Sequence, residues 1–150
     1  MAKNQFRMLR SALSGVEAVE AETRHSFSRH THEQFGIGLV SSGAQKSLSG
    51  RGMVEAAAGD IITVNPNEVH DGAPIGDGRS WRILYFDPEI VAGLSREIGE
   101  GGPGRQEIPH PVIRNRAIAA RFETLFGAVT EAKTADGLLR EQLLLQVLRH

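Results

Sequence analysis

The chain of 150 residues contains no cysteine. This absence excludes a disulfide-stapled scaffold, a zinc site built on thiolates, an iron–sulfur cluster and a cysteine nucleophile. Aromatic residues are scarce as well, at 5% of the chain, with one tryptophan and one tyrosine. A chain of this length can bury about 70% of its unfolded surface, so a single domain needs no covalent staple.

An excess of charge of one sign is also lacking, because 17 Lys and Arg residues face 18 Asp and Glu residues, for a net charge of −1. We therefore expect no sequence-specific DNA binding by these residues alone. No apolar run approaches the roughly 20 residues that span a membrane. The N-terminal residues do not resemble a secretory signal. We expect a cytoplasmic protein without membrane contacts.

Residues 15–98 have the pattern of a β-domain. Short β-rich or alternating runs are separated by segments rich in glycine, asparagine, aspartate and proline, which favours a sandwich or a barrel. Segments 41–43 and 50–52 are candidate hairpin turns, and further turns are expected at 59–60, 65–67 and 76–78. The runs that predict strands are 16–23, 35–41, 44–49, 53–57, 61–65 and 81–86.

The chain on either side of this β-domain differs in character. In the N-terminal arm, residues 1–14, the apolar residues Phe6, Leu9 and Leu13 have the spacing of one helix face. A loosely ordered terminus is the alternative interpretation of this arm. Residues 99–110 are rich in glycine and predict a linker loop.

Residues 111–150 have the pattern of two antiparallel helices. A break at 134–137 separates them, and Asp136 is placed to cap the second helix. That second helix, 138–149, is apolar around most of its circumference and must bury more than one side. The apolar stripe of the first helix consists of Ile118, Phe122, Leu125, Phe126 and Val129.

Three histidines have the spacing of a site on a β-barrel. His30 and His32 are separated by one residue, so a strand would place both imidazoles on one face. His70 ends a later apolar run that contains residues 61–64. Two imidazoles on one strand and a distant third are a way to build a three-nitrogen metal site.

The ordered set of these motifs resembles the cupin double-stranded β-helix, and more specifically the N-terminal sensing domain of AraC-type transcription regulators. The resemblance covers about residues 15–90 and rests on several motifs taken together. These are Gly15-Val16-Glu17, the segment around His30-Thr31-His32, Ile37–Val40 with Gly43, Arg51-Gly52, Gly59-Asp60, Asn65-Pro66-Asn67-Glu68-Val69-His70-Asp71-Gly72, and Trp81–Tyr85.

The resemblance implies a cupin-like barrel followed by two helices, which senses a small molecule and dimerises. In such regulators a separate C-terminal domain binds DNA. Because this chain ends inside an apolar helix, we expect it to be a fragment that lacks this domain. The N-terminal arm is expected to fold over the mouth of the barrel.

We expect a small polar metabolite to bind inside the barrel. Trp81 and Tyr85 share one face of a predicted strand, where they can stack on a ligand and hydrogen-bond to it, although ordinary core packing explains the same pattern. Arg82 and Arg51 are candidates to pair with a ligand carboxylate. The expected ligand-binding residues are His30, His32, His70, Trp81, Tyr85, Arg82 and Arg51.

The sequence favours an organic ligand over a metal at the histidines. Metal-binding cupin enzymes usually add a carboxylate after the H-x-H motif, where this chain has Gly36 and Ile37, and Glu33 would point to the opposite face. A histidine-only zinc or nickel site and purely structural histidines remain alternatives. We therefore expect no cofactor and no catalysis. A metal-dependent cupin enzyme, a dioxygenase or an isomerase, is the alternative function, and a stand-alone binding module is the third.

The apolar second helix predicts a homodimer. Soluble monomers avoid contiguous exposed apolar patches, and a two-fold helix contact buries the same residues of both subunits. Packing against a missing C-terminal part would cover this surface equally well. The predicted dimer interface comprises Leu143, Leu144, Val147 and Leu148.

Sedimentation equilibrium of the chain tests this interface. We expect a dimer that Leu144→Glu or Leu148→Glu converts to a folded monomer, because each buried leucine contributes about 1.5–3 kcal/mol. A wild-type monomer at tens of micromolar, or a dimer indifferent to both substitutions, would place the interface elsewhere.

Overall fold

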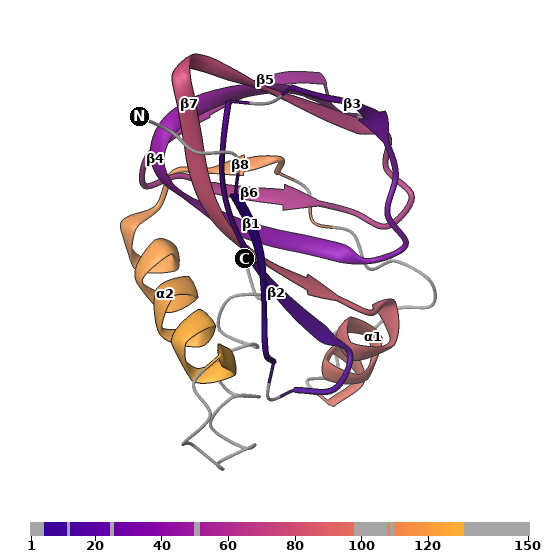
Figure 1. Cartoon of the computed structure of the whole chain (residues 1–150). Coiled ribbons are helices and arrows are strands. Elements are labelled where there is room, and N and C mark those ends of the chain that lie inside the picture. Colours follow the sequence, from indigo (N-terminus) through magenta and orange to yellow (C-terminus); the bar gives the residue numbers. More distant parts are fainter. Residues whose placement is uncertain are drawn as a thin grey trace.

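The structure is a computed structural model that describes residues 5–11, 13–24, 26–49, 52–97, 108 and 110–130. These residues form a mainly β architecture with two helices (Figure 1). The helices are α1 (Pro88–Glu97) and α2 (Arg116–Thr130), and the strands are β1 (Gln5–Leu9), β2 (Val16–Thr23), β3 (Phe27–His30), β4 (Phe35–Ser49), β5 (Gly52–Ala57), β6 (Ile61–Val64), β7 (His70–Phe86) and β8 (Val112–Ile113).

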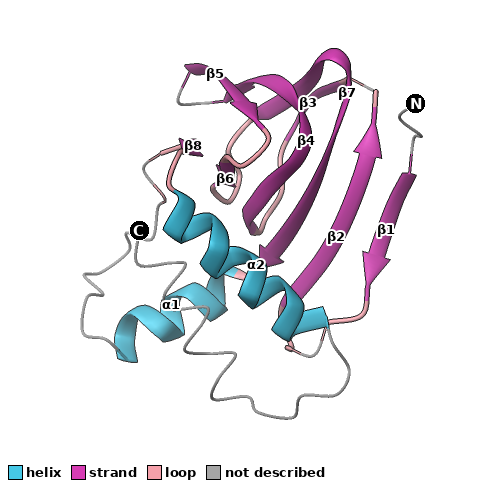
Figure 2. Cartoon of the chain, turned by 90° about the vertical axis from the view of Figure 1, so that its left-hand side faces the viewer, coloured by secondary structure: helices cyan, strands magenta, loops and turns pink. Residues whose placement is uncertain are grey.

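All strand pairs are antiparallel, in the order β1-β2-β7-β4-β6-β8, with β3 on β7 and β5 on β4. Strands β4 and β7, with 15 and 17 residues, are the longest and pair with each other along most of their length. Both strands curve around a common interior, with β3 and β5 over one end of them and β1 and β2 along the other (Figure 2). The mainly β prediction is therefore confirmed.

Two predicted turns are instead irregularities within β4 and β7. The register shifts on β4 near Gly43, which has a φ of 71° and whose missing Cβ would overlap the carbonyl oxygen of Gly78. Opposite it, residues 76–78 have no counterpart on β4, because Gly43 pairs with Arg79 and the next residue of β4 pairs with Ile75. Glycine at positive φ permits a bulge as readily as a turn, and bulges bend strands. The predicted hairpin turn at 41–43 and turn at 76–78 are thus wrong.

The core lies between one face of the sheet and α2. The predicted stripe on α2 is buried throughout, as expected. The helix begins after Asn115, whose Oδ1 accepts hydrogen bonds from the backbone N–H groups of Ala117 and Ile118 at 2.9 and 3.2 Å. The strand residues packed in the same core include Val16, Ala18, Phe35, Ile37, Leu39, Ile61, Leu84 and Phe86.

The ends of the β-domain differ from the prediction. The N-terminal arm contains strand β1, paired with β2, where the apolar spacing suggested a helix or loose chain. Helix α1 was not predicted, although Asp87-Pro88-Glu89 has the Asp, Pro and acidic residue typical of a helix start. The second predicted helix, with Leu143, Leu144, Val147 and Leu148, and most of the predicted linker lie outside the described residues.

Phe122→Ala tests the packing of α2 on the sheet. Because Phe122 is fully buried, we expect a loss of about 3–5 kcal/mol in the free energy of unfolding, measured by chemical denaturation. Arg121→Ala, on the exposed side of the same helix, should change it by less than about 0.5 kcal/mol. Equal small effects of both substitutions would contradict this packing.

Candidate functional site

The face of the sheet opposite α2 lines a cavity of about 450 Å³. Its walls come from β1, β2, β3, β4, β6 and β7 and from the loops that follow β3 and β6. Most of the exposed wall surface is apolar, and the apolar side chains that contribute to it include Phe6, Met8, Val19, Phe27, Ile62, Val64, Trp81 and Ile83. A volume of this size suits a small organic molecule.

The C-terminal half of β7 supplies one wall of the cavity. Trp81, Ile83 and Tyr85 all line it, so the predicted shared face is confirmed. Two glycines of β4 leave room for this wall: a Cβ on Gly36 would lie 3.2 Å from the Tyr85 ring, and one on Gly38 would lie 2.5 Å from Ile83 Cγ1. Any larger residue at these positions would displace a side chain of the cavity wall.

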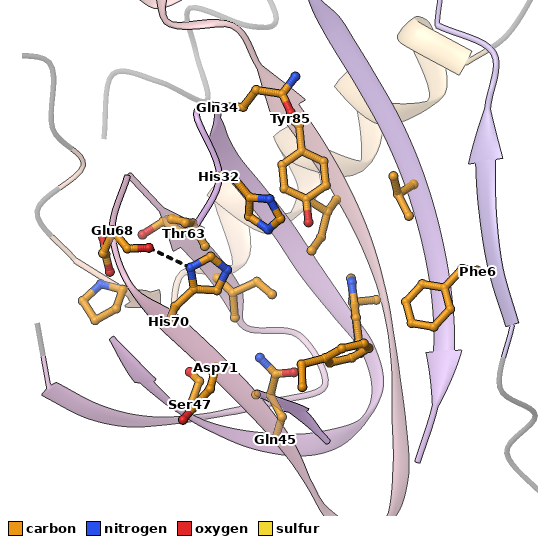
Figure 3. A pocket seen from close by; sticks show the side chains of 18 of the residues that line it. Phe6, His32, Gln34, Gln45, Ser47, Thr63, Glu68, His70, Asp71 and Tyr85 are labelled. Carbon is orange, nitrogen blue, oxygen red and sulfur yellow. Dashed lines mark hydrogen bonds between the residues drawn. The ribbon is translucent and has the colours of Figure 1, made fainter. Parts of the chain in front are cut away.

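Two histidines and the single tyrosine meet at one end of the cavity (Figure 3). The ring centroid of His32 lies 5.1 Å from that of His70 and 5.4 Å from that of Tyr85. His70 Nδ1 lies 3.0 Å from the backbone oxygen of Glu68. Because a carbonyl oxygen only accepts hydrogen bonds, Nδ1 is the donor in this contact.

The third histidine of the motif, His30, lies on β3 with its Cα paired to that of His70, but its side chain is outside the described part of the chain. Among the residues that the structure describes, no group of three or more His, Cys, Asp or Glu side chains is arranged to hold a metal ion.

The phenol of Tyr85 remains protonated at neutral pH. Burial raises its pKa above the ordinary value of 10.0, and the neighbouring carboxylate of Glu17 raises it further. Tyr85 can therefore both donate and accept a hydrogen bond inside the cavity.

Arg79 is a wall residue that the sequence analysis missed. Its side chain is almost fully buried, at 2% exposure, and its guanidinium stacks over the Trp81 ring at 4.7 Å from the centroid. Nε donates to Gln45 Oε1 at 3.2 Å, and an Nη donates to the backbone oxygen of Thr23 at 3.4 Å. Burial lowers the pKa of Arg79 to about 10, so it stays charged at neutral pH. The sequence did contain a signal for this role, because Arg79 stands two residues before Trp81 on one strand and such residues share a face.

The N-terminal strand closes one side of the cavity. Phe6 and Met8 line it while remaining 54% and 68% exposed. The Phe6 ring meets Phe27 and Trp81 edge to face, with centroids 5.6 and 6.3 Å apart. The arm thus contributes wall residues through β1, as a strand rather than a helix.

A family model described as the AraC-like ligand binding domain matches residues 13–148. The chain belongs to this family. Apart from Phe6 and Met8, the residues that line the cavity lie within the part of the chain that matches the AraC-like ligand binding domain. None of the curated proteins matches the chain in sequence.

Several solved structures are similar to this AraC-like domain at low identity. Protein NMB1881 from Neisseria meningitidis matches 58% of this chain and 89% of its own, with 13% identity and a TM-score of 0.50. A cupin-2 domain containing protein from Shewanella frigidimarina matches 55% of this chain and 82% of its own, with 14% identity and a TM-score of 0.46. Such identities concern the fold alone.

A variant of Bacillus subtilis oxalate decarboxylase is similar to 59% of this chain, with 10% identity and a TM-score of 0.48. The match covers 28% of that protein, so the AraC-like domain spans little more than a quarter of its length. In the described part of the chain, no helix is long and apolar enough to cross a membrane.

One of the two arginines expected in the AraC-like site, Arg82, does not join it. Arg82 lies on the α2 side of β7, away from the cavity, where it pairs with Glu20 at 3.6 Å and with Glu123 of α2 at 3.2 Å. Strand alternation explains this, because neighbours of Trp81 point to the opposite face. The expectation that Arg82 meets a ligand in the cavity is therefore corrected. Arg51 lies outside the described residues.

The single tyrosine makes its titration a direct measurement. We expect the tyrosinate absorbance of the folded domain to have its midpoint above 10, and Glu17→Gln to lower that midpoint without abolishing the shift, because burial is the larger cause. Glu55→Gln, on β5, is the control and should leave it unchanged. Because the folded pKa exceeds the unfolded value, stability should be unaffected below about pH 10 and should fall above it. A midpoint at or below 10 would contradict the buried position of Tyr85.

Proposed function

We propose that this chain is the effector-sensing domain of an AraC-type transcription regulator and that its cavity binds the effector. The observation that carries the proposal is the cavity of about 450 Å³, whose wall holds Trp81, Tyr85, His32 and His70. Ligand sites combine an apolar lining with a few polar groups that fix orientation, and this wall has both.

The polar groups at one end would orient the ligand. His32, His70 and Tyr85 provide hydrogen-bond donors and acceptors, and the ring centroid of His32 lies 5.1 Å from that of His70 and 5.4 Å from that of Tyr85. The rings of Phe27 and Trp81, held at a centroid distance of 6.2 Å, would pack against the rest of the molecule. The domain binds its effector without changing it chemically.

The N-terminal strand offers a route from binding to regulation. Phe6 and Met8 line the cavity from β1, which pairs only with β2 among the described strands. A ligand that contacts these side chains would stabilise β1 in this position. Regulation follows only if the ligand has different affinities for two arrangements of the arm or of the dimer. The proposal also includes a homodimer formed through residues 138–149 and DNA binding by a separate domain.

A thermal-shift screen of small metabolites tests the proposal. A ligand at about 100 times its Kd should stabilise the domain by about 2.7 kcal/mol and raise its Tm by several degrees. Val19→Phe, which adds a ring on the cavity wall, should abolish that shift, whereas Val69→Phe, at an exposed position outside the wall, should preserve it. Shifts that survive Val19→Phe would place the ligand elsewhere, and a broad screen without any hit would refute the sensor function.

A further inference from the structure

The apolar part of the cavity wall limits how many hydroxyl groups a ligand can carry. Phe6, Phe27 and Trp81 form an edge-to-face cluster, with centroids between 5.6 and 6.3 Å apart. Val19 and Ile83 continue this apolar surface along β2 and β7. A buried hydroxyl without a hydrogen-bond partner is unfavourable, so a molecule with hydroxyl groups all round would lose hydration here without replacement.

The carboxylates of the wall disfavour an anionic ligand. Three lining residues carry carboxylates, Glu17, Glu68 and Asp71, against the one guanidinium of Arg79. Asp71 Oδ1 already accepts from the backbone N–H of Leu48 at 2.7 Å. An anionic ligand would therefore meet more like charge than opposite charge in a low-dielectric cavity.

A cationic ligand would compete with Arg79. Cations bind aromatic faces, and the guanidinium of Arg79 already lies over the rings of Trp81 and Phe27, at 4.7 and 5.5 Å from their centroids. A second cation beside this cluster would be repelled by the first. The aromatic surface therefore favours an uncharged apolar group.

The group of His32, His70 and Tyr85 provides hydrogen bonds for a single polar substituent. The ring centroid of His32 lies 5.1 Å from that of His70 and 5.4 Å from that of Tyr85. Trp81 and Tyr85 are four residues apart on one strand, which separates their Cα atoms by about 13 Å. A ligand that reaches both ends of the cavity is thus elongated.

From this distribution we infer that the ligand is an uncharged, elongated and mainly apolar molecule with one hydroxyl or carbonyl group. Its apolar body packs against Phe6, Phe27 and Trp81, and its polar group bonds to His70 or Tyr85. This class differs from the small polar metabolite that the sequence suggested. The inference rests on the proposed function, because it concerns the ligand of the same cavity.

Three probes applied to the full chain test the inference, namely 4-phenylphenol, the matched anion biphenyl-4-carboxylate, and glucose. Trp81 is the only tryptophan, so its fluorescence reports binding at the apolar end, and calorimetry provides an independent Kd. We expect 4-phenylphenol to bind at least about tenfold more tightly than either other probe. Tyr85→Phe, which removes only the hydroxyl group, should weaken 4-phenylphenol by roughly two- to tenfold.

The control variant is Thr124→Ala, which removes a hydroxyl group on the exposed side of α2. It should leave the affinities for all three probes unchanged. If biphenyl-4-carboxylate or glucose binds more tightly than 4-phenylphenol, and Val19→Phe blocks that binding, the inferred ligand class is wrong. The sensor function would still stand. Failure of all three probes to bind would overturn the class as well, and the broad metabolite screen then decides the sensor function separately. If Tyr85→Phe and His70→Gln both leave the 4-phenylphenol affinity unchanged, the proposed polar end is wrong.

Discussion

The structure depends on strand β7, because one of its faces lines the cavity and the other packs in the core beneath α2. Consecutive residues near its C-terminal end alternate between the cavity, at Ile83 and Tyr85, and the core beneath α2, at Leu84 and Phe86. A shift of one residue in the pairing would exchange cavity wall and core, so the register with β2 and β4 must be fixed. The same pairing therefore determines the stability of the domain and the shape of its cavity.

Strand β7 also joins the cavity to the helix that leads toward the C-terminal part of the chain. Arg82 reaches from β7 to Glu123 of α2, and its guanidinium lies 5.7 Å from the centroid of the Phe126 ring. Partly exposed ion pairs of this kind contribute little to stability. The buried side chains of Leu84 and Phe86, on the same face of β7 as Arg82, hold α2 in place. Their apolar burial contributes more free energy than the ion pairs of Arg82.

The bends of β4 and β7 lie beside Arg79, whose guanidinium packs over Trp81 in the cavity wall. Gly43 and residues 76–78 interrupt the regular pairing just where Arg79 enters the wall. The buried Arg79 is held by Gln45 and Thr23 and is covered by aromatic rings, which offsets part of the cost of its desolvation.

The sequence by itself determined the features that depend on local periodicity. Alternation placed Trp81 and Tyr85 on one face, and the 3.6-residue spacing identified the buried stripe of α2. Only the tertiary structure decided that Gly43 forms a bulge, that Phe6 lies on a strand, that Arg79 belongs to the wall and that Arg82 does not. These outcomes depend on which distant segment pairs with each residue, and periodicity within a short window carries no information about that partner.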